Sequence, residues 1–117
     1  MQYLLLIYTP ERAWTAMSEA ERTAMYGEYF AFTASIKQSG HWLGGSPLQP
    51  VQTATTVRVR DGKPSNTDGP FAETREQLGG YYLIEATDAG EATAIAARIP
   101  GARLGAIEVR PLWNVNT

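Results

Sequence analysis

The sequence predicts an α+β fold with one antiparallel sheet and two helices on one face of it. Three observations predict this: apolar runs of strand length near both ends, two segments with helical spacing, and a hairpin signal in the middle. The expected order is β-α-β-β-β-α-β, two β-α-β halves joined by a hairpin, which is the split arrangement of a ferredoxin-like sheet.

The first part of the chain predicts a strand followed by a long helix. Residues 2–8 are an apolar strand that ends before Pro10, because proline cannot donate to the ladder. After a short loop, Ser18 and Glu21 have the spacing of a capping box, and Gly40 supplies the turn that ends the helix. The apolar residues between these points recur at helical spacing: Met25, Tyr29, Phe32 and Ile36.

The middle of the chain predicts two further strands. Residues 41–43 form a short strand that runs into a loop rich in glycine and proline. Residues 54–60 alternate valine with arginine, which is typical of a half-solvated strand. Asp61-Gly62 is a hairpin signal, and the returning segment reaches Asp68.

The last part predicts a strand, a helix and a closing strand. Residues 80–86 are apolar, and Asp88 with Glu91 has the spacing of a helix cap. Pro100-Gly101 ends this second helix, and residues 106–112 form the final strand. The expected buried stripe of the helix is Ala92, Ile95, Ala96 and Ile99.

Both faces of the predicted sheet are apolar. Tyr3, Leu5 and Ile7 point to one side of the first strand, and Leu4, Leu6 and Tyr8 point to the other. Residues 80–86 repeat this pattern, although two helices cover only one face. We therefore expect a second copy to cover the other face, so that a homodimer encloses a shared cavity.

Composition excludes several classes of function. A chain of 117 residues has the size of a single domain, residues 1–117, and is long enough to bury a core. Its net charge of −2 and the absence of a basic run argue against a nucleic-acid partner. With no cysteine and one histidine, neither a disulfide framework nor a His-rich metal cluster is expected.

The hydrophobic residues give no sign of a membrane segment. The apolar run at residues 3–8 is too short to span a bilayer, and it lacks the basic flank and the cleavage site of a signal peptide. No membrane partner is expected, and the cytoplasm is the default location.

The segment Asp68-Gly69-Pro70-Phe71 combines turn residues with a carboxylate. Pro70 has no amide hydrogen, so Asp68 cannot close the usual hydrogen bond to the residue two positions on. Its carboxylate either caps the Phe71 amide or faces a cavity, where it is available as an acid or base.

This segment and its continuation to Tyr81 resemble the signature of the YCII-related (DGPF-type) proteins. The resemblance extends from the first strand to Glu108-Val109-Arg110-Pro111, and so covers nearly the whole chain. It implies a dimeric α+β barrel of ferredoxin-like topology. Many members of the family have no assigned activity, so the resemblance implies a fold and a site more firmly than a reaction.

In the best-known branch of that family, a histidine on the first helix is proposed to work with an aspartate. The first predicted helix here contains no histidine, so that pair cannot be transferred. His41 follows the helix and is the one imidazole available as an acid or base alongside Asp68. The alternative is that His41 interacts with the negative end of the helix dipole.

Five further side chains are candidate ligand-binding residues. Within the signature these are Glu73 and Arg75, which either line the mouth of a cavity or lie on a solvated turn. Tyr8 and Glu11 flank the end of the first strand and offer a phenol and a carboxylate. Arg110 lies within the family-like segment near the end, where it either binds an anion or reaches solvent.

Two classes of function fit these residues. One is an enzyme without a cofactor that binds a small organic molecule and transfers protons through Asp68, as an isomerase or lyase does. Related barrels that act on ring-cleavage lactones and chlorinated hydroxyquinones make that class reasonable by analogy. The other is a non-catalytic metabolite-binding or accessory module with a regulatory protein partner, since similar family members are frequently linked with sigma factors.

Overall fold

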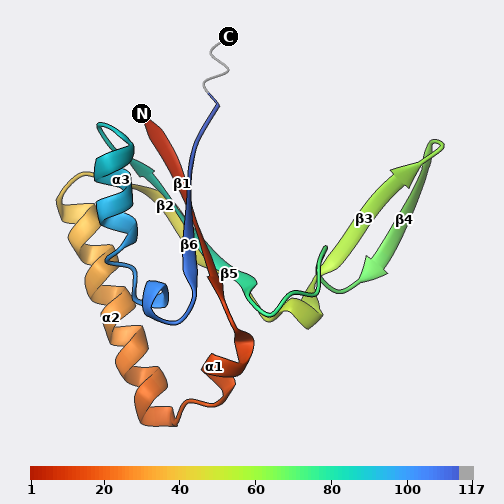
Figure 1. Cartoon of the computed structure of the whole chain (residues 1–117), viewed down its shortest axis with the longest axis horizontal. Coiled ribbons are helices and arrows are strands. Elements are labelled where there is room, and N and C mark those ends of the chain that lie inside the picture. The colour runs from red at the N-terminus through yellow and green to blue at the C-terminus, as the bar shows by residue number, and fades with distance from the viewer. Residues whose placement is uncertain (114–117) are drawn as a thin grey trace.

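The computed structural model describes residues 1–113. Figure 1 shows a body of strands and helices from which a long hairpin projects. The strands are β1 (Gln2–Thr9), β2 (Trp42–Pro47), β3 (Thr55–Arg60), β4 (Lys63–Asp68), β5 (Gln77–Glu85) and β6 (Ala106–Pro111). The helices are α1 (Glu11–Thr15), α2 (Glu19–Gln38) and α3 (Ala89–Ala96), with 3-10 turns η1 (Val51–Thr53) and η2 (Pro100–Arg103).

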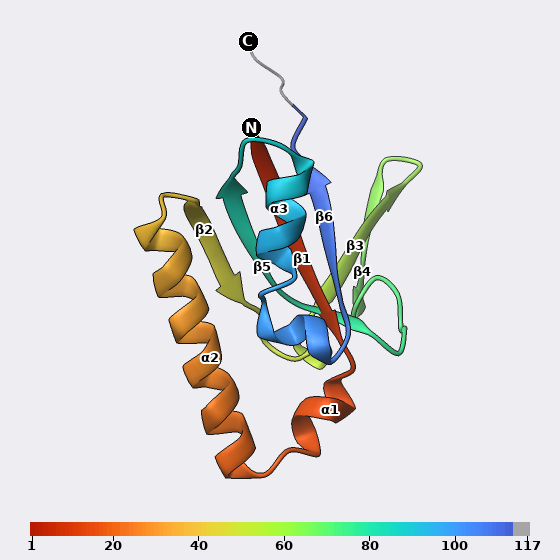
Figure 2. The ribbon, with the colours of Figure 1, turned by 60° about the vertical axis from the view of Figure 1, so that its left-hand side comes forward.

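The four strands of the body form one antiparallel sheet in the order β2-β5-β1-β6. The two central strands come from the two β-α-β halves, as a ferredoxin-like sheet requires. In Figure 2, α2 and α3 lie together on one side of this sheet. The predicted fold class is confirmed.

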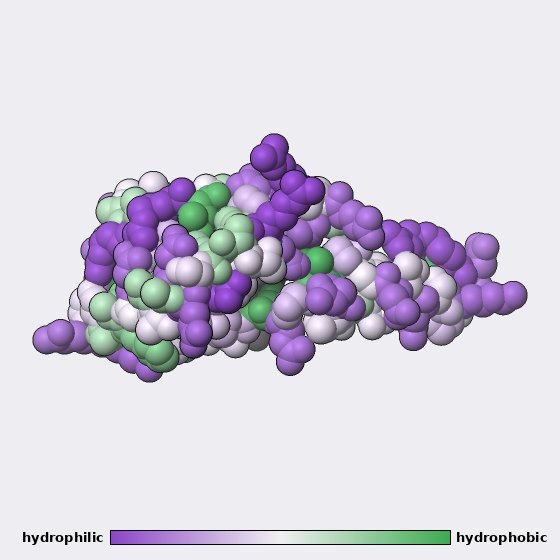
Figure 3. Space-filling model, turned by 90° about the horizontal axis from the view of Figure 1, so that it is seen from below, coloured by the Kyte–Doolittle hydropathy of each residue, from purple (hydrophilic) through white to green (hydrophobic). Residues whose placement is uncertain are grey.

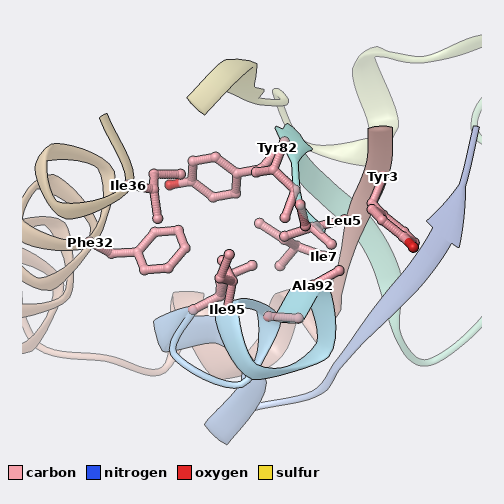
Figure 4. Packing of buried hydrophobic residues seen from close by; sticks show 12 residues of the cluster. Tyr3, Leu5, Ile7, Phe32, Ile36, Tyr82, Ala92 and Ile95 are labelled. Atoms are coloured by element: carbon pink, nitrogen blue, oxygen red, sulfur yellow. The ribbon is translucent and has the colours of Figure 1, made fainter. Parts of the chain in front are cut away.

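The core lies between that side of the sheet and the two helices (Figure 4). The predicted stripe Ala92, Ile95, Ala96 and Ile99 is buried as expected, although α3 ends at Ala96 and Ile99 lies beyond it, and Met25, Phe32 and Ile36 of α2 are buried as well. Tyr29 is partly buried against the same cluster. Because these residues recur at helical spacing, each helix buries one face against the strands.

Both helix starts follow the predicted capping. The Ser18 hydroxyl accepts from the Glu21 amide at 3.1 Å, and the Glu21 carboxylate accepts from the Ser18 amide at 3.0 Å. At α3, the Asp88 carboxylate accepts from the Glu91 amide at 2.9 Å. These bonds satisfy amide groups that a helix leaves free at its start.

Helix α1 occupies a segment that the sequence predicts to be a short loop. It starts after Pro10, which provides no capping side chain. Arg22 of α2 fastens the end of α1, because its guanidinium donates to the carbonyls of Trp14 at 3.1 Å and Thr15 at 3.0 Å. The two helices are thereby tied together where one follows the other.

Strands β3 and β4 form a separate two-stranded sheet, which we call the arm (residues 55–68). Asp61 and Gly62 form its tip with φ angles of +51° and +74°, the left-handed pair that favours a two-residue hairpin. With the arm extended to one side, the molecule is broad and flat, with extents of 47 × 47 × 18 Å (Figure 3). Its radius of gyration is 16.1 Å, whereas a compact domain of this length has about 13 Å.

Within residues 1–113, the sheet side opposite α2 and α3, which we call the open face, is uncovered. Leu4 and Leu6 of β1 point to it, because their neighbours Leu5 and Ile7 are buried on the helix side. In β5, Tyr81 and Leu83 are half-buried on the same side, opposite Leu6 and Leu4. The open face is therefore apolar along β1 and β5, as the sequence predicts, whereas its β6 edge carries Glu108 and Arg110, which are paired with Leu6 and Leu4.

Candidate functional site

A cavity of about 1210 Å³ lies where α1, η1, the base of the arm and the loop before β5 meet. We call it the α1 cavity. Three of the predicted residues besides Asp68 border it, and so do four polar residues that were not predicted to do so: Arg12, Gln52, Thr74 and Gln77. Its polar side chains include Glu11, Arg12, Asp68, Glu73, Arg75 and Gln77.

Asp68 is the last residue of the arm and reaches the α1 cavity with an exposed side chain. Gly69 turns the chain there with a φ of +106°, and its amide donates to the Ala54 carbonyl at 2.8 Å. Within residues 1–113, the Asp68 carboxylate accepts no hydrogen bond, so of the two alternatives predicted for it, the cap of the Phe71 amide does not form. The carboxylate is left free for a molecule in the cavity.

Glu73 and Arg75 lie on the exposed loop between the arm and β5, and both border the α1 cavity. Gln77 organises this loop, because its side-chain amide donates to the carbonyls of Ala72 at 3.2 Å and Thr74 at 2.8 Å. The loop is thus held by a side chain of β5 rather than by a helix.

Glu11 forms part of the opposite wall. Its carboxylate accepts a hydrogen bond of 3.1 Å from the Val51 amide, which joins α1 to η1. Arg12 is next to it and also borders the cavity. Two guanidinium groups, those of Arg12 and Arg75, therefore border the same space as three carboxylates.

Tyr8 borders a second, smaller cavity of about 570 Å³ beside the end of β1. Arg75 borders both cavities, so the two spaces adjoin. Glu108 of β6 also lines the smaller cavity. Tyr8 is thus close to the predicted loop residues but does not line the α1 cavity.

Arg110 borders neither cavity. It lies on β6 opposite Leu4, and its guanidinium binds the carboxylate of Glu108, with the Nε donor at 2.8 Å. Because Arg110 and Glu108 are two residues apart in a strand, their side chains lie on the same face. The predicted anion-binding arginine is therefore paired with an acidic residue of its own strand.

His41 lies at the opposite end of the sheet from Asp68. Its carbonyl accepts from the amide of Glu85, the last residue of β5, whereas Gln77 at the start of β5 borders the α1 cavity. Strand β5 has nine residues, so at roughly 3.3 Å per residue its first residue, Gln77, and its last, Glu85, are about 26 Å apart. His41 and Asp68 do not meet within one chain.

The surroundings of His41 are those of a helix end. Its amide donates to the Ile36 carbonyl at 2.9 Å, its Nδ1 is 2.6 Å from the Ser39 hydroxyl, and its Nε2 is 3.4 Å from the Glu91 carboxylate. A hydrogen bond from the Thr87 amide, supported by the charge of His41, lowers the pKa of Glu91. This placement favours the interaction with the helix end.

Sequence reasoning missed Arg12, Gln77 and Glu108. Arg12 follows Glu11 directly in α1, and this adjacency is the one sequence signal that could have placed it beside the cavity. Gln77 stands in the family-like segment, but its role depends on a loop conformation that no local pattern predicts. Glu108 precedes Arg110 by two residues, and the strand period alone places both on one face.

Two structural findings bear on the expected absences. In residues 1–113, no cluster of three or more histidine, cysteine, aspartate or glutamate side chains has the geometry to hold a metal ion. Over the same residues, no helix has the length and apolar character needed to cross a membrane.

The sequence matches a model of the YCII-related domain over residues 1–116. The chain belongs to this family. It is 35% identical over 114 residues to an uncharacterized protein of Rhizobium meliloti strain 1021, covering 96% of this chain and 92% of that protein. The resemblance of the DGPF segment to the YCII-related family is confirmed.

A solved structure shares the YCII-related chain's fold. It is described as the 5-chloro-2-hydroxyhydroquinone dehydrochlorinase of Burkholderia phenoliruptrix AC1100 in complex with 2,5-dihydroxybenzoquinone. The TM-score is 0.55 at 15% sequence identity, with 97% of this chain and 94% of that chain covered. At this identity the likeness shows a common fold and leaves the activity to be argued from the site.

Proposed function

We propose that this YCII-related protein is a homodimer that binds a small organic anion or phenol in the α1 cavity. The observation that supports this most is the position of Asp68, whose exposed carboxylate borders the cavity with no hydrogen-bond partner in the described residues. Arg12 and Arg75 border the same cavity and provide positive charge for an anionic group.

We further propose that Asp68 acts as a base without a cofactor. Its carboxylate would take a proton from a carbon of the bound molecule, while a guanidinium group stabilises the negative charge that develops. In an isomerase the protonated Asp68 returns the proton to another carbon, and in a lyase a leaving group departs instead. The dehydrochlorinase with the same fold makes this class of reaction reasonable by analogy.

The homodimer is supported by the open face. Leu4, Leu6, Tyr81 and Leu83 form an apolar surface that the chain's own helices leave uncovered. Soluble proteins rarely leave a contiguous apolar surface of this kind without a partner.

One observation favours the second candidate, a binding module without catalysis. In the single chain Asp68 is exposed to water, whereas a catalytic carboxylate is commonly desolvated so that its pKa suits proton transfer. A regulatory protein partner and a cytoplasmic location stay predictions, and no described residue supports either.

A screen of small organic acids and phenols by thermal shift tests the site. We expect a ligand that raises the melting temperature of the natural protein but not of Asp68→Asn, since binding to the folded state alone stabilises it. Asp61→Asn, at the tip of the arm, is the matched control and should respond like the natural protein. A ligand that stabilises Asp68→Asn equally would place the binding site elsewhere.

Turnover separates the two candidates. If the natural protein also converts a stabilising ligand, and folded Asp68→Asn converts none of it even at ligand concentrations high enough to offset its weaker binding, the turnover depends on the Asp68 carboxylate. If the ligand is recovered unchanged after long incubation with the natural protein, the protein is a binding module.

A further inference from the structure

The arm has two chemically different faces. Val57 and Val59 of β3 lie on one face together with Pro64, which is directly opposite Val59 in β4. The valine side chains are 60% and 58% exposed. The other face carries the basic residues Arg58, Arg60 and Lys63. The arm is thus an amphipathic ribbon whose apolar face is uncovered.

A ribbon of this kind needs a partner surface. Two-stranded hairpins are marginally stable in water unless a hydrophobic face packs against something else. Strands β3 and β4 contact chiefly each other, and Figure 1 shows the arm standing away from the body. The large radius of gyration has the same origin.

The open face of the same chain is a second uncovered surface of matching size, apolar along β1 and β5 and bordered by the Glu108–Arg110 ion pair on β6. A strand of six residues is about 20 Å long, and the outer strands of a four-stranded sheet are about 14 Å apart, so one arm can cross the open face completely. Since every copy has one arm and one open face, two copies related by a two-fold axis can cover both surfaces reciprocally.

We infer that the arm is an intersubunit element, whose Val57, Val59 and Pro64 face packs on the open face of a second copy of this chain. The basic face of the arm then stays in solvent, which agrees with its charge. Charged residues are depleted in the core of stable interfaces and tolerated at the rim.

This contact changes the surroundings of Asp68. Asp68 is directly opposite Thr55 in the arm, so its side chain lies on the same face as Val57 and Val59. A second copy seated on that face removes water from Asp68 as well, and the site is complete only in the dimer. The role of Asp68 rests on the proposed function, whereas the contact itself rests on the geometry of the arm.

Sedimentation equilibrium on arm variants tests the contact. We expect Val57→Ser/Val59→Ser to raise the dimer dissociation constant at least about a hundredfold, since a two-fold dimer loses four buried valines. The control Arg58→Ser/Arg60→Ser changes the same strand on its opposite face and should keep the dimer. Circular dichroism confirms that each body remains folded, because the arm contributes nothing to the core cluster.

Chemical crosslinking gives a second test that does not depend on stability. The chain has no cysteine, so single cysteines are unambiguous. We expect a short bismaleimide to join Val59→Cys of one chain to Leu83→Cys of another when the two proteins are mixed. Ser65→Cys, on the opposite face of the arm, should give little product with Leu83→Cys.

The outcomes separate this inference from the proposed function. A dimer that survives Val57→Ser/Val59→Ser and gives no Val59–Leu83 crosslink overturns the role of the arm, even if ligand binding persists. Crosslinking in a protein that binds none of the screened ligands keeps the arm contact and counts against the proposed ligand site. A monomer at all concentrations overturns the arm contact and the dimer together.

Discussion

The Glu11 carboxylate accepts a hydrogen bond of 3.1 Å from the Val51 amide, although the two residues are separated by 40 positions in the chain. This bond joins the helix after β1 to the turn before the arm. Both residues border the α1 cavity, so the bond holds α1 and η1 together in one wall of that cavity.

We therefore expect Glu11→Ala to lower the free energy of unfolding by about 1 kcal/mol, because the amide loses its acceptor. Ligand affinity should fall as well. Glu11→Gln keeps a carbonyl oxygen and is the matched variant, which urea unfolding should find nearly as stable as the natural protein. Equal stability of all three proteins would show that the bond contributes nothing to the wall.

Gly105 should not tolerate a side chain. A Cβ atom at this position would overlap the carbonyl oxygen of Tyr8 and lie 2.9 Å from the Thr9 Cα, and both are backbone atoms that cannot shift without distorting β1. We expect Gly105→Ala to destabilise the protein by about 3 kcal/mol or more in thermal unfolding.

Gly27 is the matched control for that substitution. It lies exposed in the interior of α2, where a Cβ atom would meet nothing within 4 Å. Gly27→Ala should stabilise the protein by about 0.5–1 kcal/mol, since alanine restricts the unfolded chain and favours the helix. A loss of stability there would contradict the packing described for α2.

Acid should weaken both helix starts. Hydrogen bonds from Ser18 lower the pKa of Glu21 below its ordinary value of 4.5, and the Thr87 amide and His41 do the same for Glu91. A carboxylate with a lowered pKa in the folded state stabilises it above about pH 4.5, and this stabilisation is lost as the pH falls through the folded pKa.

Urea unfolding between pH 6 and pH 3 measures this effect. We expect Glu21→Gln and Glu91→Gln to be less stable than the natural protein near neutral pH and to show a shallower decline in acid. Glu19→Gln, which removes a carboxylate from the first turn of α2 without removing a cap, is the control. An unchanged slope in both cap variants would rule out this origin of the acid sensitivity.

Alkali should destabilise the core through two tyrosines. Burial raises the pKa of Tyr29 and of Tyr82 above 10.0. The unfolded state then loses these protons at lower pH than the folded state, so stability present below about pH 10 declines as the pH rises further.

Tyr82→Phe isolates one of these phenols, since it keeps the ring against Phe32 and Trp42 and removes only the hydroxyl bonded to Thr33. We expect a shallower loss of stability between pH 9 and pH 11. A decline as steep as that of the natural protein would assign the alkaline effect to other groups.

The body of the fold was predictable because local pattern and packing agree there. The stripe from Ala92 to Ile99 and the capping box at Ser18 each need only a few neighbouring residues to be recognised. Helix α1 has five residues and follows Pro10 without a capping side chain, so neither periodicity nor a cap indicates it. Strands β3 and β4 separate from the main sheet because of the direction that the chain takes after Pro47. The alternation of valine and arginine in β3 predicts a strand but does not predict this direction.

The candidate site was predictable only as a set of residue types. The signature located Asp68, Glu73 and Arg75 because they are close in sequence. Glu11 lies with them because its hydrogen bond to the Val51 amide joins α1 to η1. His41 lies apart from them because the full length of β5 separates it from the cavity. The distance between His41 and Asp68 is set by the assembled sheet. Residue types alone therefore could not decide whether the two side chains form a pair or lie apart.

The bonds from Arg22 to the last carbonyls of α1 have a thermodynamic consequence for recognition. They attach a five-residue helix, too short to be stable by itself, to a neighbour of twenty residues. The α1 wall of the cavity is therefore ordered before a molecule binds, so little of the binding free energy would be lost in ordering the polypeptide.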